Sequence, residues 1–422
     1  LLFVLQSARC QKIDVTYLLK RSGEKMPVVD LFCGCGGLSK GFELAGFNVV
    51  AAYDEWQSAL TCYNANFNHN AQSLDLGNVE NAVNTIRPFN PTIIIGGPPC
   101  QEFSNAGKRE EGVLADLTFK YAQIVTSVLP QYFVMENVPR VKGSKAYAKA
   151  TMLYRQHNYG LTEVVLDASR CGAPQKRSRF FCIGALGAAD NFLLERIFAA
   201  YTGAPITVAT YFAQNNIPLD ISAYYRHPTT YHRRAVFSVN EVAPTIRGVN
   251  RPRPATYQHH PNDAVPANEL ENITQLTLRQ RASIQTFPQN YVFENLGIAR
   301  CDLEQMIGNA VPVVLAQFVA EQLQNHIRNA QGDINMNEHQ AFSEWLRTEK
   351  GYSDRSISDV FSRLNRAAAI LPNREINQYY IVDLEEQESY RTLSPSVRSQ
   401  IKKAINLKRA FLAHIDQAPH QT

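Results

Sequence analysis

The sequence predicts an α/β protein with a doubly wound, mostly parallel sheet, and three observations support this fold class. Short runs rich in β-branched residues alternate with longer amphipathic stretches between residues 26 and 189, as in successive βαβ units. The first four runs end in polar residues, glycine or proline, where such sheets hold their ligands. A chain of 422 residues is long enough for one large domain with smaller additions. The strand runs are residues 28–32, 48–52, 92–95, 132–135 and 179–183.

Changes of pattern along the chain predict four regions. Residues 1–26 form an N-terminal extension without recognisable chemistry, and the large domain comprises residues 27–189 and 278–328. Residues 190–277 are irregular and rich in Tyr, Pro, Arg, Asn and His, which predicts a separate, smaller domain. Residues 329–422 are helix-prone and predict a helical C-terminal extension of unassigned role. The two late helical runs are residues 278–287 and 311–327.

Composition limits the class of protein without choosing a function. There are 42 Lys and Arg residues against 38 Asp and Glu, a net charge of +4, so any nucleic-acid contact must come from local clusters. The eight cysteines have no zinc spacing, which predicts neither a metal site nor a disulfide framework. The apolar residues 1–5 are far fewer than the roughly 20 that span a bilayer. We therefore expect a cytoplasmic protein with reduced thiols and no membrane contact.

A glycine-rich turn follows the first predicted strand and precedes a helix. Residues 30–38 read Asp-Leu-Phe-Cys-Gly-Cys-Gly-Gly-Leu, and glycine lets the backbone and the free N–H groups of a helix start approach a ligand. The spacing is G-x-G-G and not the dinucleotide pattern G-x-G-x-x-G, so a pyrophosphate is not favoured. Taken alone, the turn fits a simple chain reversal equally well. The residues expected to bind are Phe32, Gly34, Gly36, Gly37 and Leu38.

Acidic residues after the next two strands extend this candidate pocket. Asp54 stands about 20 residues after the turn, beside Trp56, where an acid can accept from both ribose hydroxyls. Asp75 follows another hydrophobic-to-polar change and can accept from an adenine amine. Together these features predict an adenosine cofactor without phosphates, which fits S-adenosylmethionine. The alternative is that both acids are solvated loop ends.

A cysteine occupies the end of the third predicted strand. The apolar run leads into Gly-Gly-Pro-Pro-Cys at residues 96–100, where the prolines stiffen the turn and the glycines permit close approach. An isolated cysteine is more often a core residue, but this setting favours a reactive Cys100 beside the cofactor. The polar loop at 101–109 is suited to contact a phosphate backbone.

Charged residues at two later strands complete the candidate reaction site. Glu136 ends a buried strand, where a carboxylate is unfavourable unless it has a partner or a task. Arg177 and Arg179 alternate along an extended segment and therefore share one face. Their guanidiniums can donate to a base carbonyl, a phosphate or the Glu136 carboxylate. A surface strip of ion pairs is the alternative.

These segments, in this order, resemble the cytosine-C5 DNA methyltransferase family. The resemblance covers residues 28–189 and 278–328 and rests on the G-x-G-G loop, the Pro-Cys-Gln turn, Glu-Asn-Val at 136–138 and Gln-x-Arg-x-Arg at 175–179. It implies the fold of S-adenosylmethionine-dependent methyltransferases, with residues 190–277 as an irregular target-recognition domain. The segments that resemble that family's last two motifs are residues 279–288 and 307–312.

The resemblance also implies a reaction. A sequence-specific DNA (cytosine-5-)-methyltransferase would flip a cytosine out of the duplex and add the Cys100 thiolate to C6. Glu136 would hold N3 and the exocyclic amine, and Arg179 would donate to O2 with Arg177 in support. S-adenosyl-L-methionine would be consumed, S-adenosyl-L-homocysteine released, and no metal used. We expect a monomer of a bacterial restriction-modification system in the cytosol, nucleoid-associated through double-stranded DNA, with a cognate restriction endonuclease as an open possibility.

By the same resemblance, the last motif returns to the cofactor pocket and adds Asn309 and Ala310, while Gly97 and Pro99 line it from the reacting side. DNA contacts are expected from the loop after the cysteine and from the target-recognition region, although a solvated surface charge is the alternative for any single arginine. These expected DNA contacts are Gln101, Ser104, Arg233, Arg234, Thr245, Arg247 and Arg251.

One departure from the family concerns the adenine. Asp54 falls at the ribose-acid position, Glu55 stands where some members have a stacking aromatic, and Trp56 is displaced by one residue. Either Trp56 stacks after a local shift or other apolar groups, with Leu76 and Leu117 as candidates, hold the ring. All of these residues are therefore expected near the cofactor.

Three rival functions remain. A transfer-RNA methyltransferase of the same family is disfavoured because the Cys-Phe-Thr string of that branch is absent. A DNA-binding regulator without catalysis is disfavoured by the intact Cys100, Glu136, Arg177 and Arg179. A dinucleotide enzyme is disfavoured by the G-x-G-G spacing.

Overall fold

In a computed structural model of the protein, the structure describes residues 26–99, 113–230, 233–372 and 374–417. The described chain divides into two compact units, Met26–Gln324 and a second unit that begins at Asn325. The predicted start of the C-terminal extension lies at residue 329.

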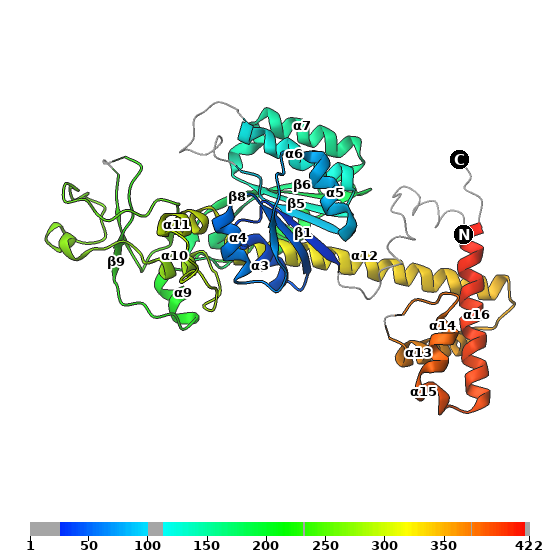
Figure 1. Ribbon diagram of the computed structural model, residues 1–422. Coiled ribbons are helices and arrows are strands. Elements are labelled where there is room, and N and C mark those ends of the chain that lie inside the picture. Colours follow the sequence, from blue (N-terminus) through cyan, green and yellow to red (C-terminus); the bar gives the residue numbers. More distant parts are fainter. Residues whose placement is uncertain (1–25, 100–112, 231–232, 373, 418–422) are drawn as a thin grey trace. The chain divides into compact units, whose positions relative to one another are not determined.

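The first unit is built on a seven-stranded sheet. Its strands are β1 (Pro27–Leu31), β2 (Asn48–Asp54), β3 (Ala71–Ser73), β4 (Ile93–Gly96), β5 (Tyr132–Asn137), β6 (Tyr159–Asp167) and β8 (Ser178–Leu186), in the order β3-β2-β1-β4-β5-β8-β6. The first five strands pair in parallel, and β8 lies antiparallel between β5 and β6. The predicted fold class, a doubly wound and mostly parallel sheet, is confirmed (Figure 1).

Burial explains which strands the sequence predicts. All residues of β4 and β5 are buried, as expected for strands covered on both faces, and these strands match continuous apolar runs. The runs predicted from the sequence do not include β3 and β6. β3 has only three residues, and β6 contains Gly160, Thr162 and Glu163, which break up its apolar pattern.

Helices cover both faces of the sheet (Figure 1). One face carries α5 (Val79–Ile86), α6 (Val113–Val128) and α7 (Lys145–Gln156), and the other carries α3 (Gly37–Leu44) and the start of α12 (Val313–Thr348). A Cβ on Gly41 would lie 2.4 Å from the Ala316 Cβ, so α3 packs directly on α12. The stretch Arg300–Ala330 is long and apolar enough to cross a membrane, yet 67% of its apolar window is buried, as in a core helix.

Residues 190–277 contain short elements and share a hydrophobic cluster with the sheet's loops and late helices. Phe212, Tyr224 and Ile246 belong to the same cluster as Cys33 and Ile307, while a separate small cluster surrounds Tyr225. The boundaries of a separate domain at residues 190 and 277 therefore remain a prediction. The elements here are α8 (Leu194–Ala200), α9 (Val208–Gln214), β9 (Ala223–Tyr225), β10 (Val236–Ser238) and β11 (Ala243–Pro244), followed by α10 (Leu278–Ile284) and α11 (Arg300–Asn309).

The second unit is helical. It contains the end of α12, α13 (Asp354–Ile370), α14 (Tyr380–Glu386), α15 (Glu388–Arg391) and α16 (Pro395–Gln417). One buried cluster joins Phe342 and Trp345 to Val360 and Phe411, and a second surrounds Tyr380. The predicted helical character of the C-terminal extension is confirmed.

Candidate active site

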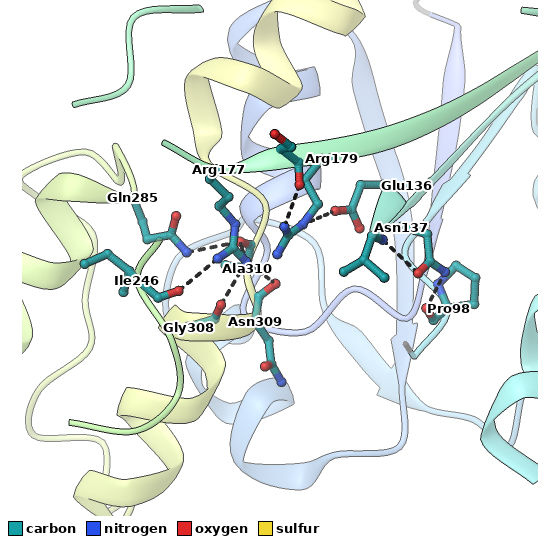
Figure 2. A network of polar contacts seen from close by, with 12 residues as sticks. Pro98, Glu136, Asn137, Arg177, Arg179, Ile246, Gln285, Gly308, Asn309 and Ala310 are labelled. Carbon is teal, nitrogen blue, oxygen red and sulfur yellow. Dashed lines mark hydrogen bonds and ion pairs between the residues drawn. The ribbon is translucent and has the colours of Figure 1, made fainter. Parts of the chain in front are cut away.

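Glu136 and Arg179 meet at the edge where β5 ends. β5 and β8 are hydrogen-bonded neighbours, and the Arg179 Nε lies 2.7 Å from the Glu136 Oε1, with the side chains 13% and 10% exposed (Figure 2). Burial raises the pKa of Glu136, although the charges of Arg179 and Arg177 oppose the rise. A carboxyl in this state accepts a proton more readily than a free glutamate.

The turn that leads to the cysteine lies beside this ion pair. A Cβ on Gly97 would lie 3.1 Å from the Glu136 Oε2, and the Asn137 Nδ2 donates to the Pro98 carbonyl at 3.2 Å (Figure 2). Sequence reasoning missed this role of Asn137. Pro99 is the last described residue of the turn, and Cys100, Gln101 and Ser104 lie outside the described residues.

Arg177 has a different environment from the predicted one. Its side chain is 1% exposed, and its two Nη atoms donate to the carbonyls of Ile246 at 2.9 Å, Gly308 at 2.8 Å, Asn309 at 3.2 Å and Ala310 at 2.9 Å (Figure 2). The burial of this side chain corrects the expectation that Arg177 contacts a phosphate, while its predicted support of Arg179 stays a prediction. The residue joins segments that are far apart in sequence and acts as a positioning residue.

Replacing Arg177 with methionine is therefore expected to destabilise the first unit by about 3 kcal/mol or more, because several buried carbonyls lose a charged donor. The chain has two tryptophans, so in a Trp345→Phe background Trp56 reports on this unit alone during urea unfolding. The exposed neighbour Lys176 gives the control, since Lys176→Met should change stability by less than about 0.5 kcal/mol. Equal midpoints for both variants would contradict the role assigned to Arg177.

Two buried glutamines, for which the sequence predicted no structural role, extend this network. The Gln175 Nε2 donates to the Gln285 Oε1 at 2.6 Å, and its Oε1 accepts from the Ile246 backbone N–H at 3.1 Å. The Gln285 Nε2 donates to the Ala310 carbonyl at 3.1 Å. Both side chains are fully buried. In the sequence, Gln175 belongs to the Gln-x-Arg-x-Arg pattern and Gln285 to the motif-like segment 279–288, but neither pattern indicates the hydrogen bond between them.

The glycine turn at the end of β1 has an open side. Phe32 and Gly34 have φ of 59° and 53°, a left-handed conformation that is unfavourable for Phe32 and typical of strained functional loops. A Cβ on Gly34 would meet nothing within 4 Å, whereas one on Gly37 would lie 2.5 Å from the Val311 carbonyl and 3.4 Å from the Ala310 Cβ. The last motif therefore contacts the turn, and Leu38 is buried behind it.

Asp54 bonds to the backbone of two loops, the glycine turn and its own loop, and is therefore less suited than Glu55 to bind a ribose. Its Oδ2 accepts from the Gly34 N–H at 2.8 Å and its Oδ1 from the Trp56 N–H at 2.9 Å. Glu55 is exposed, and its pKa is raised by partial burial and then by the adjacent Asp75 carboxyl. The structure thus places Glu55 and Asp75 together with acceptors facing solvent. We expect Glu55, rather than Asp54, to take the ribose hydroxyls.

Apolar side chains flank these acids. Leu76 is 1% exposed, and a Cβ on Gly77 would lie 3.8 Å from the Leu117 Cδ2, so Leu117 lies next to the Asp75 loop. Trp56 packs partly buried against the cluster that contains Leu60. Which of these groups stacks on the adenine stays a prediction.

Asp30, which sequence reasoning did not single out, is fully buried beneath the turn. The Ser39 hydroxyl donates to its Oδ2 at 2.6 Å, and the Tyr63 hydroxyl donates to Ser39 at 2.8 Å. Burial raises the pKa of Asp30 to about 8, in spite of the Ser39 hydrogen bond. The carboxyl is therefore protonated in the folded state at neutral pH.

Asp30 makes stability depend on pH in a defined direction. Between the ordinary value of 3.8 and about 8, the folded state binds one proton more than the unfolded chain, so unfolding free energy falls as pH rises, by up to about 1.4 kcal/mol per pH unit. Asp30→Asn should flatten this dependence between pH 4 and 8, measured by urea unfolding in the Trp345→Phe background with Trp56 as probe. An unchanged slope would show that Asp30 is ionised in the fold.

The expected DNA contacts fall into two groups. Arg233 and Arg251 are exposed, as such contacts require. Arg234 donates to Glu241 at 2.9 Å and covers the Phe237 ring at 4.4 Å, and its contact with DNA stays a prediction. The other two are also bonded within the fold, because the Thr245 hydroxyl donates to the Lys176 carbonyl and Arg247 donates to the His227 carbonyl.

Comparisons with known proteins agree with this geometry. A family model described as C-5 cytosine-specific DNA methylase matches residues 26–201 and 200–325. The Type II methyltransferase M.HindV of Haemophilus influenzae is 46% identical over 301 residues, which are 71% of this chain and 97% of that protein. The Type II methyltransferase M.HgiDI of Herpetosiphon aurantiacus is 47% identical over 307 residues, which are 72% of this chain and 95% of that protein.

Among solved structures, the S. pombe Dnmt2 methyltransferase is similar with a TM-score of 0.56 and 19% identity, over 71% of this chain and 99% of that chain. A likeness at this identity supports the fold alone. The family model spans the described residues of the first unit and ends at residue 325, where the second unit begins.

Proposed function

The chain belongs to the C-5 cytosine-specific DNA methylase family, and from this premise we propose that it methylates C5 of a flipped-out cytosine through a covalent adduct with Cys100. The observation that carries the proposal is the buried pair of Glu136 and Arg179 beside the Gly97-Pro98 turn. Cys100 follows this turn directly in the sequence, and a carboxyl and a guanidinium are the two groups that a cytosine ring needs on its polar edge.

The residues at the glycine turn suit S-adenosylmethionine. The open side of Gly34 leaves room for a ligand, α3 begins without a side-chain cap, and Glu55 and Asp75 offer acceptors for hydroxyls and an amine. The described residues of the turn and of these acidic loops include no arginine or lysine that would suit a phosphate. When bound, the cofactor supplies an electrophilic methyl group, and its sulfur keeps the electron pair of the bond that breaks, giving S-adenosylhomocysteine.

Cys100 makes C5 reactive. Cytosine C5 is a poor nucleophile, so the thiolate first forms a bond from sulfur to C6, and the electrons of the C5–C6 double bond become available at C5. After methylation, C5 loses its proton to water, the bond from sulfur to C6 breaks, and the thiolate is restored. The thiol proton lost at the start and the C5 proton lost at the end both go to solvent.

Glu136 and Arg179 stabilise charge during the addition. Electron density builds on N3 and O2 when sulfur attacks C6, and a carboxyl with a raised pKa can donate a proton toward N3. The Arg179 guanidinium lies 2.7 Å from Glu136 and would donate to O2. Unstacking the target base costs a few kcal/mol, which these contacts help to offset.

The relatives named Type II methyltransferases support a place in a restriction-modification system. We propose that double-stranded DNA is the partner, that a cognate endonuclease reads the same sequence, and that the enzyme acts as a cytosolic monomer on nucleoid DNA.

Bisulfite sequencing of DNA from bacteria that express the protein tests the proposed function. We expect protected cytosines at one position of one short sequence, and none in cells that express Cys100→Ala. Unprotected genomic DNA together with newly methylated transfer RNA would replace the proposal with the RNA-modifying alternative.

A further inference from the structure

The second unit is an addition to the methyltransferase. The family model ends at residue 325, and the two relatives are matched over 97% and 95% of their own length by about seven tenths of this chain. These two proteins, both named methyltransferases, are therefore too short to contain a counterpart of the second unit. Its own helices and buried clusters make it a module that packs around its own core.

One face of this unit forms a basic groove along α16. The groove has a volume of about 590 Å³ and is lined by Lys350, Ser399, Lys402, Lys403, Asn406, Leu407 and Ala410. Positions 399, 403, 406 and 410 follow one another at spacings of four, three and four, so they form one stripe along the helix. The lining contains three ammonium groups, a hydroxyl and an amide, and no carboxylate.

Two of the three ammonium groups are available to a ligand. Lys402 forms an ion pair with Glu385. Lys350 and Lys403 are exposed and form no ion pair with a carboxylate of the part of the chain that the structure describes. Lys350 lies 4.8 Å from the Trp345 ring centroid, a contact that restrains its position. The whole helix α16 carries five Lys or Arg residues against one Asp.

We propose that this groove binds the phosphate backbone of duplex DNA outside the methylated sequence. Lysine ammonium, serine hydroxyl and asparagine amide groups are donors that contact phosphates without reading bases. The stripe from Ser399 to Ala410 is about 16 Å long, which matches the rise of about five base pairs. Under the proposed function, the first unit already binds DNA, and the choice of DNA as the ligand of the groove rests on that proposed function. An acidic protein is the competing ligand.

The test measures binding of the full chain to a duplex, without cofactor, by fluorescence anisotropy over a range of salt concentrations. Each phosphate contact contributes about 0.9 to the slope of log affinity against log salt. Lys350→Gln combined with Lys403→Gln should therefore reduce that slope by about 1.8. The matched control combines Arg355→Gln with Arg366→Gln, two exposed arginines of α13 outside the groove, and should leave the slope as in the wild type.

Methyl transfer, measured in parallel at saturating DNA, separates this inference from the proposed function. We expect equal kcat for the wild type and both double variants. An unchanged slope in the lysine variant, or an equal fall in the arginine control, would overturn the groove as a DNA site. A wild type that binds DNA with the expected slope but transfers no methyl group would instead contradict the proposed function.

Discussion

Replacing Cys100 with alanine should lower kcat by on the order of 10⁴-fold or more, since the covalent step has no substitute nucleophile. Glu136 and Arg179 would still contact the base, but C5 would lack the electron density that addition at C6 supplies. Transfer of a labelled methyl group to duplex DNA measures the loss, and binding of DNA and of S-adenosylmethionine should persist.

Cys301 provides the matched control for that loss. It is exposed and belongs to α11, and none of the predicted catalytic residues is in that helix, so Cys301→Ala should retain wild-type kcat. An active Cys100→Ala protein, or equal losses in both variants, would mean that the thiol acts only through packing or not at all.

Glu136→Gln should lower kcat by roughly 10²- to 10³-fold. The amide can still accept from Arg179, but it cannot transfer a proton toward N3 and it removes the negative charge that pairs with the guanidinium at 2.7 Å. The loss should appear mainly in kcat, because the charge on N3 develops only as C6 is attacked.

The pH profile separates proton donation from simple pairing at Glu136. Burial raises the pKa of this carboxyl, so the protonated form persists to higher pH than in a free glutamate. In the wild type, the rate should fall as pH rises through that raised pKa, and Glu136→Gln should lack this limb. Glu163→Gln is the control, since Glu163 belongs to β6, which β8 separates from β5, and pairs with Lys142. An identical limb in the Glu136→Gln variant would contradict the role as a proton donor.

The parts of the site that could be predicted are those in which residue type and strand position together determine the environment. Buried runs identify β1, β4 and β5, and a residue that ends such a strand, such as Glu136, must reach the ligand edge of a parallel sheet. The sequence predicted Arg179 as a site residue from its charge and its place in a strand. Only the structure shows that this strand, β8, pairs with β5 and so brings Arg179 to Glu136. The resemblance to a known family supplied the roles of these residues.

The parts that could not be predicted depend on which partner a side chain finds. Arg177 and Arg179 are alike in sequence, yet the first donates to backbone carbonyls and the second to Glu136. Asp54 occupies the expected acid position but is bound to the N–H groups of Gly34 and Trp56. Charge and spacing place such groups near a site, while their hydrogen-bond partners follow from packing between distant segments.

The most direct measurement of the central claim uses DNA that carries 5-fluorocytosine at the target position. Fluorine at C5 cannot leave as a proton, so the bond from Cys100 sulfur to C6 should persist after methylation and survive denaturing electrophoresis. We predict such an adduct for the wild type in the presence of S-adenosylmethionine and none for Cys100→Ala. No adduct with the wild type, or an equal adduct with Cys100→Ala, would contradict covalent catalysis by Cys100.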